Sequence, residues 1–348
     1  MAKITPKENF MKLAHGGHPE YVPVYTMMGM PYLDECADAM IMDPTFDQNH
    51  FTDGGYDMWG VKYTQPEAGV QATMPDTSII LLEDISDWSK VIKFPKANEL
   101  DYDRVYEEGI KAANIDRNRT VLKGGTGFMP FQELVALMGF EGGLTALYTD
   151  PEEVSAMLNA MVDHIEPYYT KLFEASKPEM WYLLDDTCAE QTPFFSPEIY
   201  KEVFLPIYKR LAKPAMDNDL PVVFHNCGYV EPFMEMMTEF NVQILEPMQE
   251  QNHIMALKEQ FKGRMSMVGG WDWNKRIPAN WPNFDEEEIR ESVRDSMNKY
   301  AEGGAYGFAG GIPASSMDGE QAMKANMIVR DEAHWYGRKI YGYTGDDE

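Results

Sequence analysis

The sequence is poor in cysteine, with only three in 348 residues, and these lie too far apart to form a disulfide framework. It also lacks long apolar runs, and no uninterrupted stretch approaches the roughly 20 residues that cross a bilayer. The N-terminal segment has no apolar core of the kind found in signal peptides. We therefore expect a cytoplasmic protein that works away from membranes.

Basic side chains are also scarce, since 30 lysines and arginines face 57 acidic residues and give a net charge of -27. Such a surface repels the phosphates of nucleic acids and anionic lipids. The chain has no G-x-G-x-x-G pattern after an early strand, which disfavours a Rossmann dinucleotide-binding domain. Nucleic acids, membranes and dinucleotides are thus poor candidates for partners.

Short apolar runs alternate with longer amphipathic segments, which favours parallel βα units from about residue 120 onward. We expect strands over 22–25, 120–123, 180–184, 221–224, 242–245, 265–268 and 305–308. We expect helices over 151–176, 196–218, 230–239, 254–262, 285–302 and 320–340. The count fits one α/β domain over 1–348, a TIM (β/α)8 barrel, if a weak strand within 60–82 is included. Residues 1–20 are then an N-terminal extension, and about 30–118 contains insertions over the barrel mouth.

The segment PVVFHNCG over 221–228 presents His225 and Cys227 directly after an apolar strand. Alternate residues of a strand share a face, so both side chains can point at one place at its carboxyl end. A thiolate and an imidazole together suit Zn²⁺, and a catalytic zinc has three protein ligands with one open position. The alternative is a hydrogen-bonded histidine beside an inert buried cysteine.

Asp185 and Asp186 follow another apolar run, and alternation sends them to opposite faces. One is a candidate catalytic residue that binds a substrate hydroxyl, transfers a proton or anchors a histidine. The alternative is a solvated turn or a helix N-cap. Glu246 ends the run over 242–245, so its carboxylate should lie near His225, while Glu231 begins the helix after the H-x-C-G loop.

Aromatic side chains are candidates for the wall of an apolar substrate pocket, although such residues more often pack in a core. The candidates for substrate binding are Trp59, Tyr182 and Trp271.

With these motifs in view, the chain resembles the methyltransferase branch of the uroporphyrinogen decarboxylase superfamily. The similar segments are GGYDMWGV over 54–61, the Asp185–Asp186 pair, SPEIY over 196–200, Leu205–Pro206, HNCG over 225–228, the glycine pair at 269–270 and GGIP over 310–313. The resemblance implies a TIM barrel with its site in the carboxyl-terminal mouth. The decarboxylase itself fits poorly, because its propionate-binding segment is rich in arginine and no arginine here precedes Arg104.

The resemblance also implies a ligand set. In the coenzyme M branch, zinc is held by a His-x-Cys pair, matched here by His225 and Cys227, and by a distant cysteine where this chain has Gly310. The segment over 57–95 is more similar to corrinoid-dependent O-demethylases, some of which use two glutamates and a histidine. Glu231 and Glu246 match the glutamates in spacing, and Met267 stands in the place of the histidine. The expectation is a mixed zinc set of His225, Cys227 and Glu246, or no metal.

The leading hypothesis is a methyltransferase that takes methyl from a small donor, such as a methoxylated aromatic ether, to a corrinoid carried by a partner protein. Zn²⁺ would act as a Lewis acid on the ether oxygen. One alternative passes methyl from the corrinoid to tetrahydrofolate or a thiol, and the missing cysteine favours folate. Another is a non-catalytic small-molecule binding protein that has kept the fold.

Overall fold

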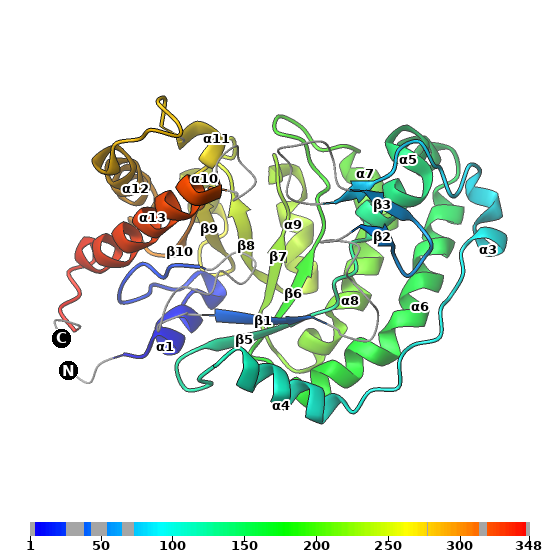
Figure 1. The fold of residues 1–348 in the computed structure, drawn as a ribbon, viewed down its shortest axis with the longest axis horizontal. Coiled ribbons are helices and arrows are strands. Elements are labelled where there is room, and N and C mark those ends of the chain that lie inside the picture. The colour runs from blue at the N-terminus through cyan, green and yellow to red at the C-terminus, as the bar shows by residue number, and fades with distance from the viewer. Residues whose placement is uncertain are drawn as a thin grey trace.

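Seven parallel strands form the main sheet in the computed structural model, which describes residues 4–25, 38–42, 54–64, 73–276, 278–312 and 319–345. Their order across the sheet is β1-β5-β6-β7-β8-β9-β10, so that from β5 onward each strand lies beside its successor (Figure 1). The strands are β1 (Asp38–Met42), β5 (Val121–Gly125), β6 (Met180–Leu184), β7 (Val222–His225), β8 (Val242–Met248), β9 (Ser266–Gly270) and β10 (Tyr306–Ala309).

The sequence places β5 to β10 within one residue of their observed starts, and the predicted α/β class is confirmed. The remaining predicted strand, at 22–25, is reduced to a parallel bridge between Val24 and Phe308 of β10. The sheet is curled like that of a TIM barrel. In the part of the chain that the structure describes it is not closed, because no pairing joins Val24 to β1.

In the described parts of 60–82, which exclude 65–72, the weak strand expected there does not join the main sheet. This stretch belongs to a separate antiparallel sheet of β2 (Gly55–Tyr56), β3 (Lys62–Thr64) and β4 (Met74–Pro75). The carboxylate of Asp57 explains the reversal, since its Oδ1 accepts hydrogen bonds from the backbone N–H groups of Trp59 (2.9 Å) and Val61 (2.8 Å). Gly60 completes the turn with a φ of +98°, and the resulting hairpin cannot supply a parallel strand.

The six predicted helical regions are all helical, although the region over 196–218 is divided by a π-helical turn over Tyr200–Phe204. Helices flank the sheet in Figure 1. Their bounds are α6 (Pro151–Ser176), α7 (Pro197–Ile199), α8 (Leu205–Asp217), α9 (Met234–Met237), α10 (Ile254–Gln260), α11 (Trp273–Arg276), α12 (Glu286–Tyr300) and α13 (Gly319–Ile340). The sequence did not predict α1 (Pro6–Met11), α3 (Trp88–Val91), α4 (Tyr102–Ala112) or α5 (Pro130–Thr149). Among the helices within the described ranges, none combines the length and apolarity needed to span a membrane.

The two faces of the main sheet are buried in different cores. One face packs against helices and belongs to the larger core, through residues such as Trp181, Phe224 and Leu245. The concave face belongs to a second core, to which α1 and the residues after it add Phe10 and Leu13. The strand residues of this inner core are Val121, Met180, Tyr182, Val223, Ile244, Val268 and Ala309.

The inner face changes from apolar to polar toward the carboxyl ends of the strands. Because side chains alternate along a strand, the next inward positions are two residues on. Those positions hold Lys123 after Val121, His225 after Val223 and Glu246 after Ile244, and all three polar side chains are buried. The fold thus brings charged groups together at one end of an apolar interior.

Candidate metal centre

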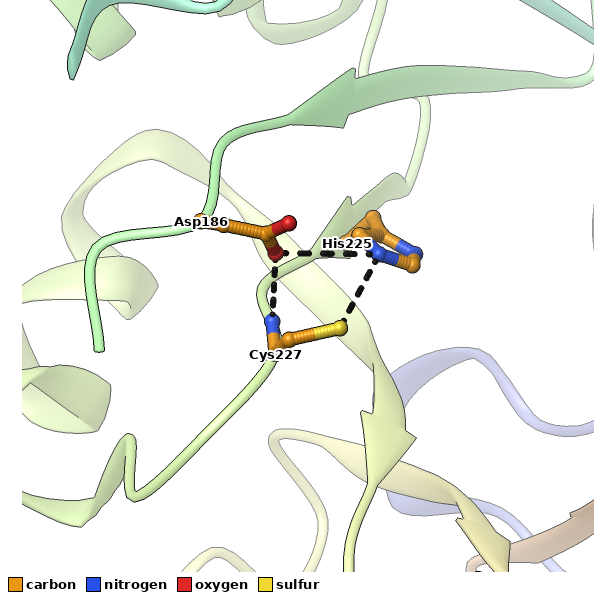
Figure 2. Close-up of side chains that lie close together, drawn as sticks. All are labelled: Asp186, His225 and Cys227. Carbon is orange, nitrogen blue, oxygen red and sulfur yellow. Dashed lines mark hydrogen bonds and ion pairs between the residues drawn. The ribbon is translucent and has the colours of Figure 1, made fainter. Parts of the chain in front are cut away.

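Three side chains from the ends of neighbouring strands converge on one point (Figure 2). His225 is the last residue of β7, Cys227 lies two residues beyond it, and Asp186 follows β6. Sγ of Cys227 lies 3.5 Å from Nε2 of His225, and Oδ1 of Asp186 lies 3.8 Å from the same nitrogen. All three donor atoms lie within 4.8 Å of one another.

This donor set fits a zinc ion in chemistry, and the two distances from Nε2 of His225 fit its spacing. Bonds of about 2.0–2.3 Å in a tetrahedral zinc site place neighbouring ligand atoms roughly 3.3–3.8 Å apart. The two distances from Nε2 fall in this range or at its edge. One sulfur, one nitrogen and one oxygen donor leave a fourth position for another ligand, as in catalytic zinc sites.

Glu246 determines which nitrogen of His225 faces the other two donors. Its Oε1 lies 3.0 Å from Nδ1 of the histidine, and both side chains are almost fully buried. Burial on its own lowers the pKa of His225, but the Glu246 carboxylate and the hydrogen bonds to Cys227 and Glu246 raise it well above its ordinary value. Burial likewise raises the pKa of Glu246, and the histidine, with help from Lys123 and Tyr182, brings it below its ordinary value. An ionised Glu246 accepts a hydrogen bond from the Nδ1–H group and leaves Nε2 directed at Cys227 and Asp186.

Asp186 also holds the loop that carries the thiol. Its Oδ1 accepts a hydrogen bond of 2.9 Å from the backbone N–H of Cys227. Its side chain is 45% exposed, whereas His225 is 7% exposed. Burial raises the pKa of the Cys227 thiol, and the hydrogen bond from His225 opposes that rise. A bound cation would favour the thiolate.

Asp185, the other member of the predicted pair, points away from this group. Its carboxylate accepts hydrogen bonds from the backbone N–H groups of Phe131 (2.7 Å) and Gln132 (3.2 Å) in the first turn of α5, and from the hydroxyl of Tyr208 (2.7 Å). Burial raises the pKa of Asp185 to about 7, while these bonds oppose the rise. Asp185 therefore supplies the cap that the N-cap residue of α5, Met129, does not.

The ligand set expected from the sequence is only partly brought together. Glu246 reaches the histidine at the opposite ring nitrogen, and Asp186 supplies the third donor. Glu231 accepts hydrogen bonds from His253 and Tyr229 outside the group. Met267 is buried in the core between sheet and helices.

The three aromatic candidates are all buried. Tyr182 is 3% exposed and donates a hydrogen bond of 2.9 Å to Oε1 of Glu246. Trp59 is 2% exposed and its ring contacts Phe94, Phe128 and His164. Trp271 is 4% exposed and donates to Ser292 of α12. Contact of these residues with a substrate stays a prediction.

Trp271 also explains how the chain accommodates Gly310. A Cβ atom at position 310 would lie 2.8–3.1 Å from three carbon atoms of the Trp271 side chain, closer than carbon atoms normally approach. A cysteine therefore cannot be placed at 310 without moving the indole. The packing at this end of β10 therefore disfavours a second thiolate at position 310.

Sequence reasoning missed two residues near the site, Lys123 and Tyr25. Nζ of Lys123 donates a hydrogen bond of 2.7 Å to the hydroxyl of Tyr25, which lies 3.5 Å from Oε1 of Glu246. The sequence does indicate a special role for Lys123, because it lies within the apolar run at 120–125. A lysine in a buried strand cannot be hydrated and needs polar partners inside the protein.

A parallel α/β sheet with a polar cluster at the carboxyl ends of its strands is the arrangement of enzymes with TIM-like barrels. The model of the family described as uroporphyrinogen decarboxylase (URO-D) matches residues 64–315, which is most of the chain. The chain belongs to the uroporphyrinogen decarboxylase family, as its motifs predict. A search of curated proteins found no match.

One solved structure shares the α/β fold over nearly the whole chain. A methyltransferase from Methanosarcina mazei is similar over 95% of this chain and 100% of its own, with a TM-score of 0.60 and 13% sequence identity. A D-psicose 3-epimerase, solved in the presence of D-fructose, is similar over 69% of this chain and 84% of its own, with a TM-score of 0.39 and 13% identity. At such identities the likeness concerns the fold alone.

Proposed function

We propose that this protein is a methyltransferase that moves a methyl group from a small methyl donor to a corrinoid carried by a partner protein. The observation that carries the proposal is the convergence of Asp186, His225 and Cys227 at the carboxyl ends of the strands. Family membership and the fold shared with a methyltransferase support the same class.

In this proposal some residues hold or orient the cation, and the exposed side of the site admits the methyl donor. A zinc ion held by Asp186, His225 and Cys227 would supply a Lewis acid for the donor oxygen, so that the leaving oxygen is less basic when methyl departs. Glu246 orients the imidazole from behind. Asp186 is far more exposed than His225 and would mark the side from which the donor approaches. In this proposal Asp185 acts indirectly, by joining the loop after β6 to α5.

The donor class that fits best is a methyl ether, such as a methoxylated aromatic. The packing of Trp271 on Gly310 disfavours a thiolate at position 310, where a zinc site of the coenzyme M type has its second cysteine. The same observation keeps transfer from a methylcorrinoid to tetrahydrofolate as the second candidate, because a folate acceptor does not need a soft, thiolate-rich zinc site.

We also propose that the main sheet closes into an eight-stranded barrel, with the segment around Val24 next to β1. The parallel bridge of Val24 to Phe308 supports this arrangement, since it places an eighth chain segment beside β10. The donor and the corrinoid would then enter through a single mouth formed by the loops at the carboxyl ends.

The test combines elemental analysis with an assay of methyl transfer. Purified protein should contain about one zinc per chain and form methylcorrinoid from a Co(I) corrinoid protein and at least one member of a panel of methyl ethers. His225→Ala and Cys227→Ser should lose the metal and lower the rate by more than about 100-fold, since ligands are at least as costly to lose as their hydrogen-bond partners.

Glu231→Gln is the matched control, because Glu231 belongs to the alternative ligand set but lies outside the group. It should leave both metal content and rate unchanged. A metal-free wild-type protein that forms no methylcorrinoid with any donor would overturn the proposal. Methyl transfer from methylcorrinoid to tetrahydrofolate alone would replace it with the second candidate.

A further inference from the structure

Buried polar side chains form a chain of contacts from Lys123 through Tyr25 and Glu246 to His225. His225 in turn belongs to the candidate metal-binding group of Asp186, His225 and Cys227. The chain of contacts begins at Lys123 in the middle of β5, whose side chain lies within the curl of the sheet and is 2% exposed. A buried ammonium group is costly unless hydrogen bonds and an opposite charge compensate for its lost hydration. The groups that replace the lost hydration of the Lys123 ammonium must therefore be held in fixed positions around it.

Two tyrosines and one carboxylate surround this lysine. Nζ of Lys123 donates to the hydroxyl of Tyr25 at 2.7 Å and lies 4.0 Å from the centroid of that ring, and 5.1 Å from the centroid of the Tyr182 ring. Both positions favour a cation, because the faces of aromatic rings are electronegative. The ammonium group also acts on the fully buried carboxylate of Glu246 and favours its ionised form.

Oε1 of Glu246 is where these contacts meet the site. It accepts a hydrogen bond of 2.9 Å from Tyr182, has the hydroxyl of Tyr25 at 3.5 Å and lies 3.0 Å from Nδ1 of His225. Because the two tyrosines hold this oxygen in place, the imidazole has one orientation in which Nδ1 makes its hydrogen bond to Glu246. In that orientation Nε2 faces Cys227 and Asp186.

We propose that Lys123 is a positioning residue for the metal centre, acting through Tyr25, Tyr182 and Glu246 to hold His225 with Nε2 ready to bind. The inference rests on the proposed function, because it presupposes that the group holds a divalent metal. It assigns Lys123 a role without contact to metal or substrate. Partners of this kind typically change metal affinity by 10- to 100-fold.

The experiment measures zinc affinity by competition with a chromophoric chelator at one fixed pH, and records the visible spectrum of the Co²⁺-loaded protein. Lys123→Met should weaken zinc binding by about 10- to 100-fold and alter the Co²⁺ spectrum. Tyr182→Phe, which removes one hydroxyl and keeps the ring, should weaken binding by a smaller factor. Because Tyr182→Phe is a conservative substitution, it keeps the inference testable if the Lys123→Met variant does not fold.

Lys258→Met is the matched control. Lys258 is a buried lysine, 6% exposed, that donates to the backbone oxygens of Tyr300 and Glu302 and is not part of the network around Glu246. Its substitution removes a buried ammonium of the same kind and should leave zinc affinity and the Co²⁺ spectrum unchanged.

A double-mutant cycle separates positioning from general damage. If Lys123 acts through Glu246, Lys123→Met should have little further effect on zinc affinity in a Glu246→Gln background. Additive losses, equal losses for Lys123→Met and Lys258→Met, or wild-type affinity in both Lys123→Met and Tyr182→Phe would each overturn the inference. Failure of the wild-type protein to bind zinc or Co²⁺ would instead overturn the proposed function.

Discussion

Two adjacent aspartates at the end of β6 have opposite environments. Asp185 is 1% exposed and binds the start of α5, whereas Asp186 has a side chain 45% exposed and reaches His225 and Cys227. Alternation along the strand predicts the separation. It does not predict which aspartate faces the site, because that depends on α5, a helix that the sequence pattern did not reveal.

The two aspartates should respond differently to the same substitution. Asp185→Asn should lower the free energy of unfolding by about 2–4 kcal/mol, because an amide N–H would face a backbone or tyrosine donor in a buried place. Asp186→Asn should keep the stability of the wild type while it weakens zinc binding. Urea denaturation and metal analysis of both variants check this pair of expectations. Loss of stability in Asp186→Asn together with a stable Asp185→Asn would reverse the assignment.

At the scale of elements, the small antiparallel sheet meets α5 through two buried carboxylates. Oδ2 of Asp57 and Oε2 of Glu133 are buried, and neither has a hydrogen-bond partner among the residues that the structure describes. Burial raises the pKa of Asp57 to about 6. Burial, followed by the charge of Asp57, raises the pKa of Glu133 well above its ordinary value. The folded state therefore binds protons at this contact more tightly than the unfolded chain.

It follows that this contact stabilises the fold most at low pH. When the folded-state pKa of an acid is raised, its contribution is complete below the unfolded pKa of about 4 and is lost as pH rises through the folded pKa. Glu133→Gln should therefore raise the melting temperature by at least about 2 °C at pH 8 and change it little at pH 4.5. Calorimetry at the two pH values provides the measurement.

Glu141→Gln is the control for that prediction, because Glu141 lies on the same helix and is exposed. Its effect should be small and equal at both pH values. A Glu133→Gln variant that is less stable than the wild type at pH 8 would mean that the ionised carboxylate is held by a favourable contact.

The sequence predicted elements well where one periodicity dominates. Strands β5 to β10 are apolar runs buried on both faces. Helix α12 starts at a capping aspartate, Asp285, and α6 starts at a proline with two acidic residues in its first turn. In α5 the signal failed for two reasons. Its apolar residues are spread around the helix, and Gly139 interrupts it with a φ of +72° and a ψ of 162°. The sequence places His225, Cys227 and Asp186 at strand ends, but which side chains lie within reach of one another depended on contacts between loops.

At the scale of the whole molecule, the N-terminal segment completes the interior of the curled sheet. Phe10 and Leu13 belong to the inner core, and the Phe10 ring stacks on Tyr25 with centroids 5.9 Å apart. Ser266 of β9 donates a hydrogen bond to the backbone oxygen of Leu13. Phe10 and Leu13, within the extension expected over 1–20, are therefore packed against strands from the far end of the chain.

Removal of one ring from this segment should destabilise the entire fold. Phe10→Ala should lower the free energy of unfolding by about 3–5 kcal/mol, since Phe10 is fully buried and the cavity would be lined by inner-core residues. Lys12→Ala, which breaks only the exposed ion pair with Glu20, should leave stability unchanged. Chemical denaturation of both variants would show whether the segment is part of the core, and equal stabilities would show that it is not.

The packing of Trp271 on Gly310 also has a consequence for how this family can diverge. Because a side chain at 310 and the indole at 271 compete for the same space, position 310 cannot gain a side chain while Trp271 stays in place. A descendant that acquires a cysteine at 310 must first, or at the same time, exchange Trp271 for something smaller. The route between the two kinds of ligand set therefore passes through a paired substitution, and positions 271 and 310 should covary among relatives.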